Sequence, residues 1–202
     1  MSPKPVDKSQ KRLEIAMAAF DLFAEQGFSH TSIDDVARAA NVAKGTIYNY
    51  FDTKEEIVFT IMDTVMEAKY QGFLKRIANA SSVKEKIHAF FQFDGDEGLL
   101  AKMLKLFHNF FGTLLINPSP QMIERHCRVE EQHTLILEAL IEEGIADGEF
   151  RPTDVQTLIH QMNLVHKGIL FQSRFSGDGP KEIQQKITRH IEFTLTCIAK
   201  ES

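Results

Sequence analysis

The stretch NVAKGTIYNYF, residues 41–51, decides how the N-terminal part of the chain folds, because its apolar and polar side chains separate around a helix. At 100° per residue, Ile47 and Phe51 lie about 40° apart and form one buried seam. Tyr48 and Tyr50 fall about 80° to either side of that seam. The stretch therefore predicts a short helix with one anchored face and two tyrosines that flank it.

The face opposite the seam carries only small or polar side chains, which are Gly45, Thr46 and Asn49. Side chains of this size let a helix approach the edges of DNA bases, where Thr and Asn supply hydrogen-bond donors and acceptors. Lys44 begins this helix and Lys54 begins the next one, and both positions suit phosphate contacts. We therefore expect the helix to read bases in a DNA groove.

The two tyrosines leave two interpretations open. Their hydroxyls could reach phosphates on the groove walls, which is where side chains that flank a recognition face lie. Alternatively, both rings could simply pack the helix onto its neighbours. We favour a phosphate or base contact for Tyr48, and the same for Tyr50 with less support.

A second short helix is predicted just before this stretch. Ser32 caps its N-terminus, Asp35 three residues later completes a capping box, and the helix continues to Ala40. Asn41 then stands where the chain must turn sharply, and Asn tolerates left-handed backbone better than most residues other than Gly. A longer helix that ends at Gly27 precedes both. This order is that of a helix-turn-helix DNA-reading unit.

The segment from Gly27 to Ile57 resembles the TetR family of bacterial transcriptional regulators. The chain departs from the family pattern at Asn41, where Gly is usual, and at Asp34, where a basic residue is frequent. The resemblance implies that the C-terminal helices dimerise and bind an inducer that alters DNA affinity. The matching positions are Gly27-Phe28, Thr31-Ser32, Val36-Ala37, Asn41-Val42, Lys44-Gly45-Thr46-Ile47-Tyr48, Tyr50-Phe51 and Lys54.

The expected DNA partner is a double-stranded, near-palindromic operator. Most of the expected contacts lie on the short helix of the opening stretch or at its start. The remainder lie at the starts of the two neighbouring helices. The residues expected to contact DNA are Thr31, Ser32, Ala43, Lys44, Gly45, Thr46, Tyr48, Asn49, Tyr50 and Lys54.

Helical spacing recurs along the rest of the chain, and no segment alternates like a strand, so the expected fold is all-α with about nine helices. We expect residues 1–53 to form a three-helix helix-turn-helix DNA-binding domain. Residues 54–202 are expected to form a helical bundle for ligand binding and dimerisation. The first helix of that bundle is long, from Lys54 to about Ala78, and contains no proline.

Composition is compatible with this organisation. The 202 residues are 43% hydrophobic and carry a net charge of -5, but residues 1–54 contain as many basic as acidic side chains, which permits DNA binding. Neither cysteine belongs to a C-x-x-C pair, and no apolar run suggests a signal peptide or membrane span. We expect a cytoplasmic protein without membrane contact.

The predicted bundle contains apolar residues spaced to point inward, so we expect a pocket for a small, mostly lipophilic effector. Asn163 or His166 could orient such a ligand. The helices expected at residues 153–175 and 180–198 are apolar on more than one side, which suits a homodimer interface. The expected ligand-binding residues are Met62, Met66, Phe107, Phe110, Phe111, Met162, Asn163 and His166.

Other chemistry has little support. His126, Glu130 and His133 share one predicted helix face and could form a metal site with His160 or His166, but none of the paired-ligand signatures for zinc is present. The glycine-rich FSGDGPK, residues 175–181, follows a helix and lacks the Lys-Ser/Thr ending of a phosphate loop. No nucleophile elbow or HExxH motif occurs, so we expect no enzyme, metal or cofactor.

The sequence therefore predicts a ligand-responsive DNA-binding regulator, and specifically a repressor that leaves its operator when the effector binds. The alternative is a helical DNA-binding interaction protein that a protein partner controls without any small-molecule ligand. The effector, the operator sequence and the regulated genes are not encoded in any motif.

Overall fold

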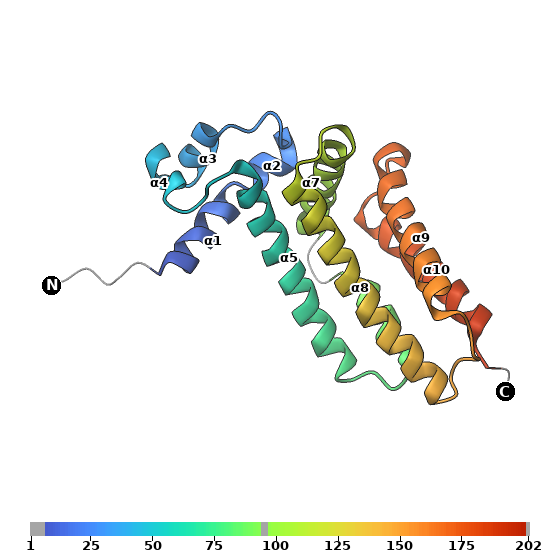
Figure 1. Ribbon diagram of the computed structural model, residues 1–202. Helices are drawn as coiled ribbons and strands as arrows, with labels where there is room; N and C mark the ends of the chain where they lie inside the picture. The colour runs from blue at the N-terminus through green and yellow to red at the C-terminus, as the bar shows by residue number, and fades with distance from the viewer. Residues whose placement is uncertain (1–6, 94–96, 201–202) are drawn as a thin grey trace. The chain divides into compact units, whose positions relative to one another are not determined.

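The computed structural model describes residues 7–93 and 97–200, apart from the side chains of Phe111 and Leu114. Within these ranges the chain is helical, as expected, and the only extended pairing is an isolated bridge between Phe150 and Ala199. The helices, shown in Figure 1, are α1 (Lys8–Ala18), α2 (Phe20–Gln26), α3 (Ile33–Ala39), α4 (Lys44–Tyr48), α5 (Lys54–Ile77), α6 (Val83–Phe91), α7 (Glu97–Ile116), α8 (Pro120–Ala146), α9 (Val155–Ser176) and α10 (Pro180–Ile198).

One difference from expectation lies at the start of the chain, where a single helix was predicted. It is interrupted at Ala19, whose N–H bonds to the carbonyl of Ala16 at 3.1 Å in a tighter turn, so that α1 and α2 form separately. In the part of the chain that the structure describes, no helix combines the length and apolarity needed to cross a membrane.

The chain divides into two compact units. The first contains residues 1–68 and 102–122, and the second contains residues 69–101 and 123–202. The boundary expected at residue 53 lies inside the first unit because Ile57 and Ile61 of α5 and Phe110 of α7 share one core with Ile47. The helix-turn-helix is therefore built on the beginning of α5 and on most of α7 as well as on α1 and α2.

The short helices of the first unit begin and end at the expected signals. The Ser32 hydroxyl accepts a hydrogen bond from the Asp35 N–H at 3.2 Å, and the Asp35 carboxylate accepts one from the Ser32 N–H at 3.0 Å. α2 ends at Gly27, where φ is 79°. At the start of α5, Thr53 accepts from the N–H of Glu56 at 3.3 Å.

The turn between α3 and α4 confirms the expectation for Asn41. Its φ is 51°, and it is the residue other than glycine with positive φ among those described. The following N–H, of Val42, reaches back to the carbonyl of Ala37 at 3.0 Å and closes the turn. In Figure 1, α3 and α4 lie next to each other beside α1.

The second unit contains α6, α9, α10 and most of α8. Its core contains Ile87, Leu137, Ile159 and Ile191, all at most 1% exposed. At one end, a Cβ added at Gly144 would lie 2.3 Å from the ring of Phe150, so no larger residue fits there without movement. The helices of this unit are thus held by a continuous aliphatic interior.

The left-handed backbone at Asn41 gives a stability prediction. Asn41→Val places a β-branched side chain in a conformation it disfavours, and we expect the free energy of unfolding to fall by about 1–2 kcal/mol in urea denaturation. Asn41→Gly should change it by less than about 0.5 kcal/mol because glycine adopts this conformation freely. Asn79→Val, at a position without positive φ, is the control. Equal losses for both valine variants would contradict the argument.

Candidate nucleic-acid interface and ligand sites

α4 presents the polar face that the sequence predicts. Ile47 is completely buried, whereas Gly45 and Asn49 are exposed and Thr46 is partly buried. A Cβ built on Gly45 would meet no atom within 4 Å, so the space in front of the helix is open. Ala43, immediately before the helix, is exposed as well. The geometry leaves a small, flat surface that can approach a base pair closely.

Tyr48, the last residue of α4, and Tyr50, two residues beyond it, differ in their surroundings. Tyr48 is 53% exposed, so its ring and hydroxyl are available to a partner. Tyr50 is partly buried, and its side chain packs against the core of the first unit. The ring of Tyr50 therefore contributes to packing, whereas Tyr48 is the tyrosine that the structure leaves open to solvent.

Arg12 of α1 fixes the end of α4, a role that the sequence does not reveal. Its guanidinium donates to the carbonyl oxygen of Tyr50, lies 4.3 Å from the ring centroid of Phe51, and is 3.4 Å from the Glu56 carboxylate. These contacts link α1, the end of α4 and α5. No spacing rule connects residues this far apart in sequence, so no local pattern could have identified Arg12.

Lys44 is exposed at the start of α4, and it is held by an acidic neighbour. Its Nζ donates to the Asp34 carboxylate at 2.9 Å, which bridges α3 and α4. The hydrogen bond that Lys44 donates to Asp34 holds the pKa of Lys44 above its ordinary value, so the side chain stays charged. A phosphate at this position would therefore compete with Asp34 for the ammonium group.

Thr31 and Lys54 were expected to contact DNA, but their polar groups form hydrogen bonds within the protein. Thr31 is 1% exposed, and its hydroxyl donates to the carbonyl of Gly27 at 2.9 Å. Lys54 donates to the carbonyls of Phe28 at 2.7 Å and Thr31 at 3.0 Å, and its Nζ lies 4.3 Å from the Phe28 ring centroid. Burial lowers the pKa of Lys54. Both side chains hold the loop before α3 rather than face a partner.

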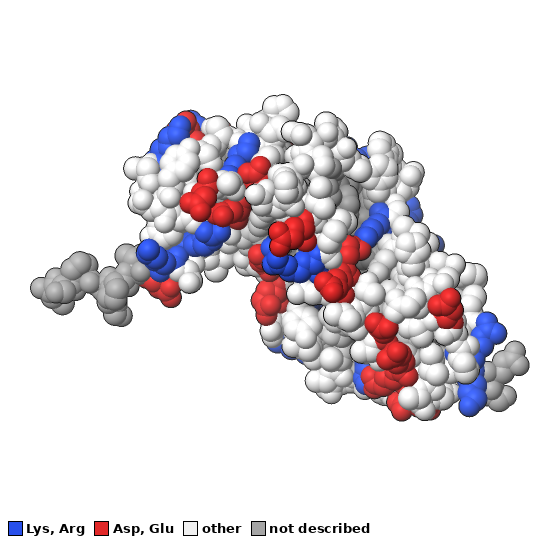
Figure 2. Space-filling model, viewed as in Figure 1, with Lys and Arg blue, Asp and Glu red and all other residues white. Residues whose placement is uncertain are grey.

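Ser32 is exposed, but its side chain is committed to the capping box of α3. Asp35 in that box also pairs with Arg38, an exposed cation that the sequence argument did not select. Figure 2 shows Lys and Arg side chains interleaved with Asp and Glu side chains over the visible surface. The basic groups of the candidate interface are thus largely paired within the protein.

The residues expected to bind a ligand are divided between the two units. In the first, Phe110 is 3% exposed and lies 6.2 Å from the ring of Phe59, while Met62, Met66 and Phe107 are partly buried. The side chain of Phe111 lies outside the described part of the chain.

In the second unit, Met162 is completely buried, and Asn163 and His166 are partly buried. Asn163 also borders a pocket of about 280 Å³ between α8 and α9. Polar side chains line most of that pocket, so it is not the lipophilic site that the sequence predicts. Its lining is Glu130, Thr134, Gln156, Ile159, His160, Asn163, Leu164 and Lys167.

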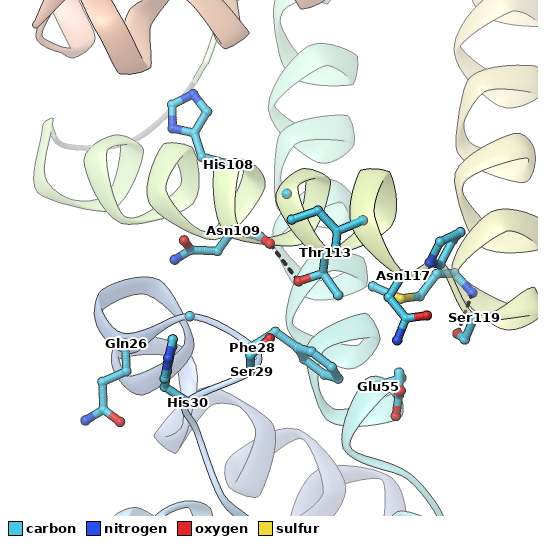
Figure 3. A pocket seen from close by; sticks show the side chains of 15 residues that line it. Gln26, Phe28, Ser29, His30, Glu55, His108, Asn109, Thr113, Asn117 and Ser119 are labelled. Atoms are coloured by element: carbon cyan, nitrogen blue, oxygen red, sulfur yellow. Dashed lines mark hydrogen bonds between the residues drawn. The ribbon is translucent and has the colours of Figure 1, made fainter.

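A pocket of about 480 Å³ in the first unit is absent from the sequence-based prediction (Figure 3). Residues 26–30, Glu55 of α5 and His108, Asn109 and Thr113 of α7 border it from separate parts of the chain. The Asn109 amide joins α7 to α2 by donating to the carbonyl oxygens of Phe23 and Ala24, at 3.3 and 3.1 Å. Three segments far apart in sequence form this pocket, so no motif marks it.

Large apolar side chains remain exposed on α9 and α10. Phe175 is 69% exposed and Phe193 is 71% exposed, and Phe171 lies 5.3 Å from Phe175 between ring centroids. Leu164 and Val165 on α9 are 54% and 42% exposed. Exposed apolar residues gathered on neighbouring helices indicate a surface that a partner covers.

The α8 residues that the sequence analysis considered and rejected as metal ligands include two with other contacts. Glu130 pairs with Lys167 of α9, and the ring of His133 packs edge-on against Phe90 at 5.5 Å between centroids. Within the described residues, no group of three His, Cys, Asp or Glu side chains is placed to hold a metal ion.

Residues 15–61 match the model of the family described as "Bacterial regulatory proteins, tetR family". The HTH-type transcriptional repressor KstR2 of Mycolicibacterium smegmatis is 26% identical over 150 residues, which are 73% of this chain and 71% of that protein. The fatty acid metabolism regulator protein of Bacillus subtilis is also 26% identical over 150 residues, 71% of this chain and 73% of that protein.

A solved structure supports the same fold over the whole chain. The transcriptional regulator of the TetR family from Cytophaga hutchinsonii superposes with a TM-score of 0.80 at 19% identity, covering 99% of this chain and 100% of that one. The predicted all-α fold with an N-terminal helix-turn-helix is confirmed.

Lys54 gives a prediction that separates a structural from a DNA-contacting role. Lys54→Met removes the ammonium group from two carbonyl acceptors, and we expect the free energy of unfolding to fall by about 2 kcal/mol in urea denaturation. Lys75→Met, at an exposed lysine late in α5, should cost less than about 0.5 kcal/mol. Unchanged stability together with a weaker salt dependence of DNA binding would restore the phosphate contact instead.

Proposed function

Proceeding from its place in the TetR family of bacterial regulatory proteins, we propose that this chain is a homodimeric repressor that a small molecule releases from its operator. The matched family domain and the relatives together identify the chain as a DNA-binding transcriptional regulator. The observation that carries the proposal is the open polar face of α4 above the completely buried Ile47. The alternative, control by a protein partner without a ligand, gains no support from these relatives.

In the proposed complex, α4 enters the major groove. Gly45 permits close approach, and Thr46 and Asn49 face the base edges. Tyr48 and Lys44 lie at the side and start of the helix, where phosphates run. Ala43 and the exposed start of α3 at Ser32 complete the contact surface, and Tyr50 supports it from behind.

The dimer proposal rests on the exposed apolar surface of α9 and α10. Two copies that join these surfaces across a twofold axis would present two recognition helices about 34–36 Å apart, one turn of DNA. A near-palindromic operator follows from that symmetry. We expect a cytoplasmic location because the DNA partner lies there.

The effector is proposed to bind in the second unit, at the expected ligand-binding residues Met162, Asn163 and His166. It would act by favouring a dimer in which the spacing of the two α4 helices does not fit the operator. The ligand can shift that equilibrium only by its differential affinity for the two states, typically about 1–3 kcal/mol. No enzymatic step enters this mechanism.

DNA recognition is tested by selection from random sequences followed by binding titrations at several salt concentrations. We expect enrichment of one near-palindrome. Lys44→Ala should weaken binding and reduce the slope of log affinity against log salt by roughly 2 per dimer, since each copy loses one phosphate contact. Asp34→Asn, which frees Lys44, should strengthen binding.

Tyr48→Phe isolates the hydroxyl and should weaken operator binding without changing the unfolding midpoint. For the Lys44→Ala experiment, the control for loss of one positive charge is Lys75→Ala, at an exposed lysine outside the interface. Failure to enrich any near-palindrome would contradict the proposed function. If Lys44→Ala had the same salt slope as Lys75→Ala, Lys44 would have no phosphate contact.

The dimer interface is tested by charge insertion. Phe175→Glu combined with Phe193→Glu should convert the dimer into a monomer in sedimentation experiments, because two carboxylates per copy would be buried against an apolar surface. The control is Leu135→Glu, at another exposed apolar residue, which lies on α8 and is 57% exposed. A double variant that remains dimeric would locate the interface elsewhere.

A further inference from the structure

A cluster of basic side chains lies inside the second unit around two phenylalanines of α6. The Lys69 Nζ is 5.3 Å from the ring centroid of Phe90, and the His133 ring is 5.5 Å from the same centroid. The His166 ring is 5.1 Å from Phe91, which in turn is 5.1 Å from Phe90. Three helices, α5, α8 and α9, therefore direct nitrogen-bearing groups toward one aromatic pair. We name Lys69, His133 and His166 the cationic cluster.

Within the described ranges, no carboxylate is placed to compensate the charge of Lys69. Among the described residues no carboxylate pairs with Lys69, and Glu130, on the same helix as His133, is engaged by Lys167. Burial and the nearby Arg76 lower the pKa of Lys69 to about 8. Burial, with Lys69 next in importance, lowers the pKa of His133 to about 4 and that of His166 to about 3.

His190 of α10 adds an independent geometric observation. Its Nε2 atom is buried and has no hydrogen-bond partner among the described residues. The same imidazole is one of the basic groups that disfavour a charge on His166. Buried polar atoms in folded proteins nearly always have a partner, so an orphaned ring nitrogen beside a basic cluster indicates a missing one.

A buried charge or polar group without a partner costs free energy. Near neutral pH Lys69 is the charged member of the cluster, and it has no carboxylate partner among the described residues, while the two imidazoles are neutral polar groups. Phe90 offsets part of this cost for Lys69 through its ring face, but it offers nothing to the imidazoles' nitrogens. Basic groups, apolar rings and residual accessibility in one place are the features of a ligand site rather than of a sealed core. Lys69, His133 and His166 all keep partly accessible surface.

We propose that the cationic cluster binds the anionic group of an amphipathic organic acid, and that this acid is the effector of the regulator. The inference rests on the proposed function, because it names the chemical class of its effector. Phe90 and Phe91 contact the carbon skeleton beside the anion, while Lys69 and the imidazoles donate hydrogen bonds to it. The mostly lipophilic ligand expected from the sequence thus acquires one charged end.

Binding an anion stabilises the protonated imidazoles, so complex formation takes up protons. Lys69, whose pKa in the free protein is about 8, loses its proton as pH rises through 8. Affinity for an anion that is ionised throughout should therefore be higher at pH 6 and 7 than at pH 8, and it should fall further above pH 8. Among the described residues, Arg76, Lys167 and His190 are further basic groups near the cluster, and Glu130 is the acidic group that pairs with Lys167.

The test is calorimetric titration of the full chain with decanoate, decyl phosphate and decanol at pH 6, 7 and 8. An anion should bind at least tenfold more tightly than decanol, with affinity rising at lower pH. Tighter binding of decanoate than of decyl phosphate would identify the effector as a carboxylic acid, and the reverse would identify it as a phosphate ester. Equal affinity of these two anions would show that the site recognises only the negative charge. All three results support the proposal. Equal binding of decanol overturns it.

Lys69→Met should weaken decanoate binding about tenfold and leave decanol binding unchanged, with Lys75→Met on the same helix as the matched control. Lys69→Met should fold at least as stably as the parent, because it removes an uncompensated cation. A less stable variant with unchanged decanoate binding would make Lys69 structural. Proton resonances of His133 and His166 should titrate at higher pH with decanoate present, and unchanged midpoints would exclude both from the site.

Operator binding separates this inference from the proposed function. Decanoate that binds with the expected pH dependence without releasing operator DNA supports the site and overturns its regulatory role. Operator release by neutral lipophilic ligands, without any anion binding, leaves the repressor function standing and overturns the anionic site.

Discussion

The burial of Ile47 and Phe51 is the constraint on which the recognition surface depends. A helix of five residues has no stability of its own, because isolated helices shorter than about 12–15 residues are marginal in water. α4 exists because its apolar seam is buried in the core of the first unit and because Arg12 holds the carbonyl of Tyr50, two residues after the helix ends. Every outward side chain on α4 takes its direction from that seam.

The sequence was informative wherever one helix face or one cap determined the outcome. The all-α fold, the left-handed Asn41, the capping box of Ser32 and the open face of α4 all follow from spacing or local backbone chemistry. Thr31 and Lys54 could not be placed in this way, because their acceptors are carbonyl groups of a loop whose path depends on the tertiary fold. The pocket beside Asn109 and the cluster around Phe90 could not be predicted from the sequence for the same reason.

Two sets of basic residues have surroundings that differ from those expected of their positions. Lys44 and Arg38 at the candidate DNA surface have acidic partners, although a nucleic-acid surface is expected to leave cations free. Lys69 in the second unit lacks such a partner among the described residues, although an interior is expected to provide one. Charge counting by region could not detect either arrangement, because both depend on which side chains meet after folding.

The pairing of Lys44 with Asp34 means that the proposed DNA-contacting surface already holds a negative charge against its lysine. A lysine that is free in solution releases a condensed cation from DNA when it meets any phosphate, whatever the base sequence. Lys44 must first exchange a carboxylate for the phosphate, so a random stretch of chromosome gains less from it. Only a site where the bases also fit α4 supplies the remaining free energy. If Lys44 contacts DNA as proposed, Asp34 lowers the affinity for non-specific DNA more than the affinity for the operator, which increases sequence specificity.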